Sequence, residues 1–314
     1  MKNNEKGEFV RWESRFRNWV TPTGDAGPSG QEGFKAEPGR YHLYISHACP
    51  WAHRTMIYRK LKGLEKLITV SVVHPVMPEE SWVFGTYPGS TVDHLHGYQR
   101  LEQLYNRVSP NYDGIVTVPV LYDKKRDMIV NNESSEIIRM LNSAFDEWGD
   151  SSVDYYPEAL RAEIDEINAF VYDHINNGVY KTGFANSQQA YEQAYDNLFK
   201  ALDELERRLS EQRYLAGDRI SEADWRLFPT LVRFDSVYYS HFKCNRQRII
   251  DYPHLWAYLR ALYQHPGIAD SVNMDHIKTH YYVSHPFLNP SGIVPKGPEI
   301  DFLSQDEMGL YART

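Results

Sequence analysis

The sequence has few features of a secreted, membrane-spanning or nucleic-acid-binding protein. Only 2 cysteines occur among 314 residues, so a disulfide framework is excluded and a reducing compartment is favoured. No run of about 18 apolar residues is present, and the start, MKNNEKGEFVRWES, lacks the apolar core of a signal peptide. The net charge of -8 gives no basic excess for a nucleic-acid surface. We therefore expect a cytoplasmic protein with no membrane or nucleic-acid partner.

Several common motifs of catalysis and binding are also missing. The sequence contains no Walker loop, no Gly-x-Gly-x-x-Gly and no Gly-x-Ser-x-Gly elbow. His94 and His96 flank Leu95, with Asp93 beside them, but no further ligands follow at a spacing that suits zinc. We expect this stretch to be a polar loop or helix start, and we expect no metal site.

The first half of the chain alternates between strand and helix patterns. Apolar, β-prone runs at 41–46, 68–75, 116–123 and 127–132 predict strands, and helical spacing predicts helices at 50–64, 97–108 and 134–142. This order predicts an α/β domain over residues 41–145, closed by a hairpin. An irregular arm, residues 1–40, precedes it.

The second half of the chain is predominantly helical. After a polar linker at 146–157, helical patterns predict an all-α domain over residues 158–270. Ser221 and Asp224 form a capping-box pattern at the start of one of these helices. Residues 271–314 are rich in His, Tyr and Pro. We expect them to be an irregular extension that packs on the body or on a dimer partner.

One cysteine, Cys49, lies between a predicted strand and a predicted helix. A helix N-terminus offers free N–H groups and about half a positive charge, which stabilises a thiolate. Ala52 occupies the position where a dithiol enzyme carries its second cysteine. Cys49 is therefore expected to react as a monothiol, through a mixed disulfide that an external thiol resolves. The alternative is a small buried structural residue, which is our expectation for Cys244.

A proline lies inside the predicted strand 116–123. Proline cannot donate to a sheet ladder, so it is confined to edges, ends or special turns. Pro119 is thus either an ordinary edge proline or part of a cis Val118–Pro119 bond that turns strand backbone toward a ligand.

The combined motifs resemble a known family. The order strand, Cys-Pro-Trp-Ala, helix, TVPVL, NNESSEII and an all-helical second half is similar to glutathione transferases. The longer strings YHLYISHACPWAHRTMIYRKLKGLE, NNGVYKTGFA and HYYVSHPFLNPSGIVP resemble the Xi class, the glutathionyl-hydroquinone reductases. The resemblance runs from about residue 8 to residue 298. It implies a thioredoxin-like domain, an α-helical domain that binds hydroquinone, and a homodimer.

The resemblance also implies a reaction and a set of site residues. Glutathione acts as co-substrate, with no tightly bound cofactor, and Cys49 removes it from a glutathionyl-hydroquinone. The matching glutathione-site positions are Trp82, Ile115, Val116, Thr117, Val118, Pro119, Glu133 and Ser134. The matching tyrosines around the hydroquinone and the thiol are Tyr180, which is also catalytic, Tyr238 and Tyr281.

Three alternatives remain open from the sequence. The family often has an arginine at the position of Ile115, so γ-glutamylcysteine is an alternative to glutathione. An omega-type monothiol transferase, which reduces mixed disulfides or dehydroascorbate, is an alternative activity. The pair Glu133 and Ser134 is also what simple helix capping would require. A non-catalytic ligand-binding module on the same fold is disfavoured by the intact Cys49 and the three tyrosines.

Overall fold

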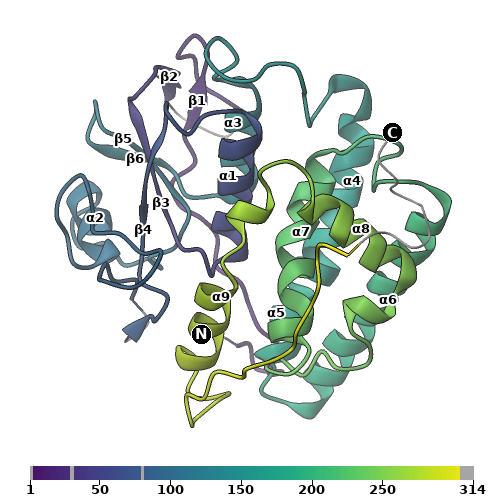
Figure 1. Cartoon of the computed structure of the whole chain (residues 1–314). Coiled ribbons are helices and arrows are strands. Elements are labelled where there is room, and N and C mark those ends of the chain that lie inside the picture. The colour runs from purple at the N-terminus through teal and green to yellow at the C-terminus, as the bar shows by residue number, and fades with distance from the viewer. Residues whose placement is uncertain (1–2, 29–31, 79–80, 305–314) are drawn as a thin grey trace. The chain divides into compact units, whose positions relative to one another are not determined.

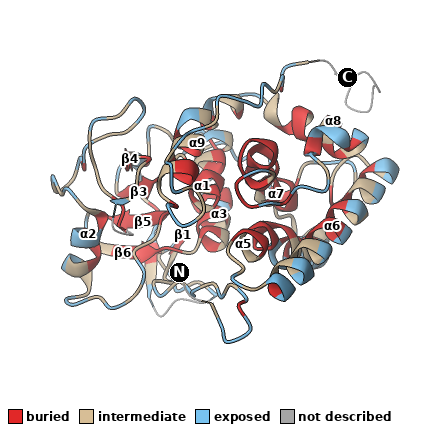
Figure 2. Cartoon of the chain, turned by 90° about the horizontal axis from the view of Figure 1, so that it is seen from below, coloured by how far each residue is buried: buried red, intermediate tan, exposed pale blue. Residues whose placement is uncertain are grey.

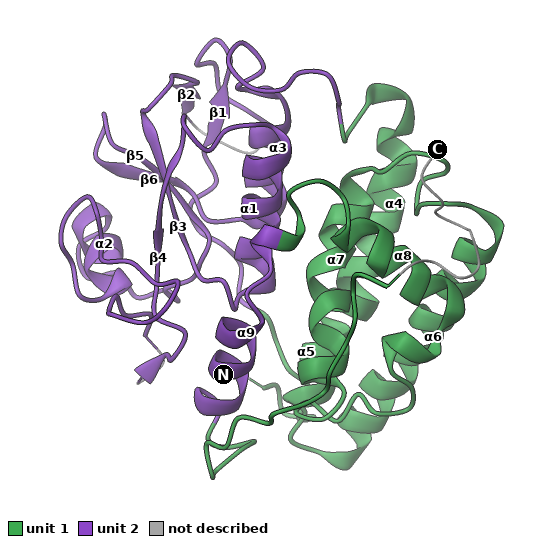
Figure 3. Ribbon diagram, viewed as in Figure 1, with its two compact units in different colours: residues 1–11, 155–269, 286–314 green, residues 12–154, 270–285 purple. Residues whose placement is uncertain are grey.

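The computed structural model divides into two compact units (Figure 3). It describes residues 3–28, 32–78 and 81–304. Unit 1 comprises residues 1–11, 155–269 and 286–314, and unit 2 comprises residues 12–154 and 270–285. Each unit is therefore built from segments that are separate in the sequence. Within the described ranges, no helix has the length and apolar character needed to cross a bilayer.

Unit 2 is built on a mixed sheet with the strand order β4-β3-β5-β6. Its strands are β3 (Tyr41–Ile45), β4 (Thr69–Val72), β5 (Val120–Asp123) and β6 (Met128–Asn131). Strand β3 pairs in parallel with β4 and antiparallel with β5, and every residue of β3 is buried. Helices α1 (Pro50–Leu61) and α3 (Ser134–Ser143) cover one face of the sheet, and α2 (Leu101–Val108) lies on the other (Figure 1). This is the expected thioredoxin-like arrangement.

Two expectations about unit 2 need correction. The strand predicted over 116–123 begins only at Val120, because Pro119 has no N–H to give to the ladder. The arm over 1–40 is not wholly irregular, since β1 (Trp19–Thr21) and β2 (Gly33–Lys35) form a parallel pair. Strands of three residues are too short to show a period. They are stabilised by burial of Val20 and Phe34, each 1% exposed.

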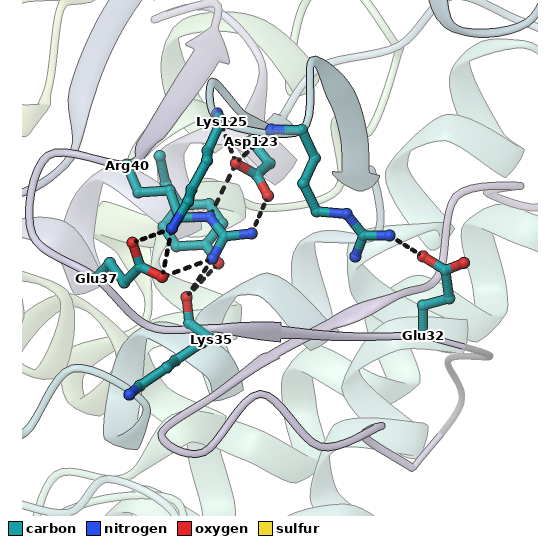
Figure 4. Close-up of polar contacts among 8 residues, drawn as sticks. Glu32, Lys35, Glu37, Arg40, Asp123 and Lys125 are labelled. Atoms are coloured by element: carbon teal, nitrogen blue, oxygen red, sulfur yellow. Dashed lines mark hydrogen bonds and ion pairs between the residues drawn. The ribbon is translucent and has the colours of Figure 1, made fainter.

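A charged network binds the arm to the sheet (Figure 4). The guanidinium of Arg40 donates to both carboxylate oxygens of Asp123, a fully buried residue at the end of β5. It also donates to Glu37 at 2.9 Å, which in turn pairs with Lys125 at 3.1 Å. Because an unpaired buried carboxylate would be costly, Asp123 fixes Arg40 and the arm segment next to it.

Unit 1 is a helical bundle. Its helices are α4 (Arg161–Val171), α5 (Gly178–Gly183), α6 (Gln188–Glu211), α7 (Glu222–Arg233) and α8 (Pro253–Tyr263). Shorter turns lie at η2 (Glu158–Leu160), η3 (Tyr172–Asn176), η4 (Phe234–Tyr238) and η5 (Ile249–Asp251). The turn η6 (Ala269–Ser271) spans the point where the chain passes from unit 1 to unit 2. Helix α7 is buried almost all round, whereas α6 keeps an exposed face (Figure 2). The all-α expectation for this part of the chain is confirmed.

The irregular extension expected over 271–314 is wrong for its first part. Residues Met274–Val283 form helix α9, whose start is capped by Asn273, with the Asn273 side chain accepting from the His276 N–H at 3.0 Å. Residues 270–285 belong to unit 2, while the stretch from Pro286 returns to unit 1. There the ring of Phe302 stacks on Tyr263, with 4.8 Å between centroids.

The start of α7 depends on one buried carboxylate. Asp224 is fully buried and accepts hydrogen bonds from the N–H and hydroxyl of Ser221, at 2.7 and 2.9 Å. It also accepts from the Leu215 N–H at 2.9 Å and the Tyr258 hydroxyl at 2.8 Å. Burial raises the pKa of Asp224 above its usual value, and the hydrogen bonds oppose that rise. The predicted capping box is therefore confirmed. The hydrogen bond from Tyr258 also connects Asp224 to α8.

Asp224→Ala should destabilise unit 1 strongly, because it leaves four buried donors without their acceptor. We expect the free energy of unfolding to fall by about 3–5 kcal/mol in chemical denaturation. Asp218→Ala, a nearby exposed aspartate, is the matched control and should change it by less than about 0.5 kcal/mol. Similar small losses in both variants would contradict this role for Asp224.

Candidate active site

Cys49 lies where β3 leads into α1. It is the N-cap of α1, is half-buried, and is followed by Pro50 at the first helical position. Its thiol Sγ donates to the carbonyl oxygen of Val118 at 3.5 Å. The Val118–Pro119 bond is cis, which confirms the isomer expected in the second of the two interpretations of Pro119. The thiol and the turn before β5 are thus adjacent, although 69 residues separate them.

Cys49 lies at the N-terminus of α1, a setting that in general stabilises a thiolate. The first turn of α1 carries no acidic residue, and its N–H groups give the helix end a partial positive charge. The position in the same helix that would carry the second thiol of a local disulfide is Ala52, which is fully buried. The chemistry open to this cysteine is attack on an incoming sulfur.

A tyrosine from α2 holds the backbone next to Pro119. The buried hydroxyl of Tyr105 donates to the Thr117 carbonyl oxygen at 2.8 Å, and it accepts from the Thr117 N–H at 3.3 Å. The Asn132 side-chain amide also donates to it, at 3.3 Å. Burial raises the pKa of Tyr105 to about 12, so it stays a neutral donor. Val116 and Thr117 are half-buried, and Ile115 is 41% exposed.

Glu133 and Ser134 lie together at the start of α3. Glu133 is the N-cap, and its carboxylate accepts from the Ser135 N–H at 3.1 Å and the Ser135 hydroxyl at 2.9 Å. Its other oxygen accepts from the Ser14 hydroxyl at 3.1 Å. The capping role left open by the sequence is therefore present. A capping role does not exclude a further contact of this carboxylate with a ligand ammonium group.

Arg54 is a residue near this site that the sequence did not single out. It is 1% exposed, and its guanidinium donates to the Ser134 hydroxyl at 3.4 Å. The same group lies 4.6 Å from the ring centroid of Trp51. A buried guanidinium beside a helix N-terminus makes the region of Ser134 favourable for a carboxylate. The sequence signal that could have identified Arg54 is its position as a charged residue on the buried face of α1.

Trp82 lies in the segment after β4 and is buried, with 7% exposure. Its ring stacks on that of His280 in α9, with 4.9 Å between centroids and 20° between planes. Its carbonyl oxygen accepts from the Leu101 N–H at 2.9 Å, at the start of α2. Sequence reasoning found Trp82 but missed His280, because α9 itself was not predicted.

The three tyrosines divide between the units. Tyr180 in α5 and Tyr238 in η4 lie together in unit 1, with 6.0 Å between ring centroids. Tyr238 is in a π-helical turn, and a second π-helical turn, η3, closely precedes α5. Such turns are frequent at functional sites. Tyr281 belongs to unit 2, where it is 2% exposed and contacts the ring of His285.

The Tyr180 ring also contacts the arm. The Arg11 guanidinium lies 4.7 Å from its centroid, and the Phe9 ring is stacked at 6.3 Å. Arg11 donates in addition to the side-chain oxygen of Asn177. In the part of the chain that the structure describes, no group of three His, Cys, Asp or Glu side chains is placed to hold a metal ion.

Two family descriptions match the chain. "Glutathione S-transferase, N-terminal domain" matches residues 48–144, and "Glutathione S-transferase, C-terminal domain" matches residues 188–261. The first match spans Cys49, Trp82, Pro119 and Ser134. The second spans Tyr238 and most of the helical bundle.

Similar proteins are known in bacteria and fungi. The glutathionyl-hydroquinone reductase YqjG of Escherichia coli is 56% identical, over 93% of this chain and 89% of its own. The glutathione-bound structure of YqjG matches this structure with a TM-score of 0.90, and the match covers 94% of the YqjG chain. PcpF of Sphingobium chlorophenolicum, also named a glutathionyl-hydroquinone reductase, is 53% identical over 93% of this chain and 90% of its own.

A fungal structure shows the same similarity. The glutathione-S-transferase Xi of Phanerochaete chrysosporium has a TM-score of 0.90 and 53% identity, with 95% of both chains covered. Identity of this size extends over both units, well beyond the cysteine motif. The chain therefore belongs to the glutathionyl-hydroquinone reductases, the Xi class of the glutathione transferases.

Proposed function

We propose that this protein reduces S-glutathionyl-hydroquinones to hydroquinones with glutathione as reductant. In the net reaction, one glutathionyl-hydroquinone and one glutathione give a hydroquinone and glutathione disulfide. The observation that carries the proposal is the placement of Cys49, a monothiol at a helix N-terminus with Sγ 3.5 Å from the Val118 carbonyl oxygen. The names of the relatives at 53% and 56% identity supply the substrate class.

The reaction has two steps. The Cys49 thiolate attacks the glutathione sulfur of the substrate, an S–S bond forms and the bond from sulfur to the ring breaks. The electron pair of that bond stays with the hydroquinone, which takes up one proton. A second glutathione thiolate then attacks the mixed disulfide, which releases glutathione disulfide and restores the Cys49 thiolate.

The remaining residues have proposed binding roles. Backbone of Val116, Thr117, Val118 and Pro119, with Ile115 before them, faces the cysteinyl part of glutathione. Glu133 takes its ammonium group, Ser134 its γ-glutamyl carboxylate, and Trp82 completes the pocket. Tyr238 and Tyr281 pack on the hydroquinone, and the Tyr180 hydroxyl donates the proton or a strong hydrogen bond to the leaving group.

The second cysteine lies in a very different environment. Cys244 is fully buried, and its sulfur lies 4.0 Å from the Val179 carbonyl oxygen. Burial raises the pKa of the Cys244 thiol far above its ordinary value. It therefore stays protonated and shielded, as expected of a structural cysteine. Only Cys49 is suited to exchange with a small thiol.

Location and assembly are proposed on narrower grounds. The two cysteines form no disulfide, which supports a reducing compartment such as the cytoplasm. The homodimer rests on the family resemblance.

Thiol labelling distinguishes the two cysteines. With Ellman's reagent at pH 7.5, the native protein should release one equivalent rapidly, and the denatured protein two. Cys244→Ser should keep the fast phase and Cys49→Ser should lose it. A fast phase that survives in Cys49→Ser would mean that the Cys244 thiol is accessible.

Cys49→Ser should abolish hydroquinone release, because a serine hydroxyl is a far weaker nucleophile toward sulfur than a thiolate. With glutathionyl-menadiol, wild type should release menadiol and show the glutathione adduct by intact mass when no free glutathione is present. Running the reaction with glutathione and with γ-glutamylcysteine identifies the preferred thiol.

Three results of this assay would be unfavourable. Absence of menadiol release by wild type would overturn the proposed activity. Release by Cys49→Ser at the wild-type rate would overturn the mechanism. Disulfide exchange without menadiol release would instead favour an omega-type thiol transferase.

Tyr180→Phe tests the proton-donor role. The variant should lower kcat for glutathionyl-menadiol by about 100-fold or more, since general acid assistance typically contributes that much. Reduction of a simple glutathione mixed disulfide, whose leaving group is a thiolate, should change by less than about threefold. The control variant is Tyr239→Phe, in which the tyrosine next to Tyr238 in the sequence is changed. Equal losses on both substrates would assign Tyr180 a role in binding or folding instead.

A further inference from the structure

Helix α9 contacts the segment that carries Trp82, from Pro75 to Gly89, near both ends of that segment. At the beginning of this segment, the Nδ1–H of His280 donates to the Pro75 carbonyl oxygen at 2.8 Å. Two residues later, the Met77 N–H donates to the Ser284 hydroxyl oxygen at 2.9 Å. Both contacts are to backbone groups, so they fix the path of the chain and not only its side chains.

The end of the same segment is bound to the first turn of α9. The Tyr87 hydroxyl donates to Asp275 at 2.8 Å, and the Nε2–H of His276 donates to the Pro88 carbonyl oxygen at 2.7 Å. At Gly89, with φ +87°, a Cβ atom would lie 3.0 Å from His276 Nε2. The positive φ and this close approach favour glycine at position 89.

Three of these contacts, those of His276, His280 and Ser284, come from one face of α9 and its C-terminal end. His276, His280 and Ser284 are four residues apart, and side chains at that spacing lie above one another on a helix. His276 and His280 are buried, at 0% and 7% exposure. The face is therefore covered by the Trp82 segment, and the segment has a rigid support on that side.

His280 acts on Trp82 in two ways. Its hydrogen bond to Pro75 fixes the orientation of the imidazole and places the proton on Nδ1. The ring oriented in this way stacks on the indole at 4.9 Å. Trp82 is thus held by a side chain whose own freedom has been removed by a backbone contact.

We infer that His280 is a positioning residue for glutathione binding, which holds Trp82 in the geometry that the tripeptide requires. This inference rests on the proposed function, in which Trp82 belongs to the glutathione site. A binding group must be held to within about half an ångström by supporting contacts. The role of His280 is to provide that support from a helix that lies nearly 200 residues further along the chain.

His280→Ala tests the inference by kinetics. We expect KM for glutathione to rise about tenfold with kcat within about twofold, because binding geometry is lost while the thiol is untouched. His280→Phe keeps the ring without its hydrogen bond, and His280→Asn keeps a donor without the ring. Each should recover part of the loss. Met274→Ala, on α9 but making none of these contacts, should match wild type.

A spectroscopic signature accompanies the kinetics. The protein is labelled with 5-fluorotryptophan, and the ¹⁹F resonance of Trp82 is identified by its absence from Trp82→Phe. Addition of glutathione should shift this resonance in wild type and Met274→Ala. In His280→Ala the free resonance should be broadened or displaced, and the glutathione needed for half of the shift should rise about tenfold.

The outcomes separate this inference from the proposed function. Unchanged glutathione binding in His280→Ala, with weakened binding in Trp82→Phe, overturns the role of His280 alone. Unchanged binding in Trp82→Phe overturns both this inference and the place of Trp82 in the glutathione site. If wild type releases no hydroquinone, the activity is wrong, and calorimetric titration of glutathione into the same variants still decides the role of His280.

Discussion

The register between β3 and β5 is the constraint on which the site depends. Tyr44 pairs with Val120 across the antiparallel ladder, so the chain leaving β3 toward Cys49 meets the chain entering β5 from Pro119. A slip of one residue would turn every side chain of β5 to the opposite face of the sheet. The burial of β3 and β5 on both faces therefore also fixes the distance between the thiol and the Val118 carbonyl oxygen.

Several residues around Cys49 hold the backbone or a neighbouring side chain in place. Tyr105 holds the backbone at Thr117, Glu133 caps α3, and Arg54 lies behind Ser134. Each of these contacts uses a buried or half-buried polar group that needs a partner in any case. Hydrogen bonds that stabilise the fold therefore lie at the positions proposed to recognise glutathione. Substitutions here are expected to affect both stability and binding.

Sequence reasoning succeeded where the signal was local. Cys49 and Pro50 marked the start of α1 correctly, and the Ser221–Asp224 pattern marked the start of α7. The strands β1 and β2 and the helix α9 were missed, because their stability comes from distant contacts. The pairing of β1 with β2, and the bonds from His276 and His280 to the segment after β4, have no counterpart in the local sequence. Without the family resemblance, Tyr180, Tyr238 and Tyr281 could not have been chosen from 23 tyrosines.

The order of synthesis gives a further consequence to the discontinuous unit 2. Its main segment ends at residue 154, but its last segment, with α9, ends only at residue 285. At about 5–20 residues per second, the sheet emerges from the ribosome many seconds before the helix that supports Trp82. The nascent chain therefore carries Cys49 and the Trp82 segment before the helix that contacts this segment has been made. Completion of unit 2 is delayed until residue 285 has been made.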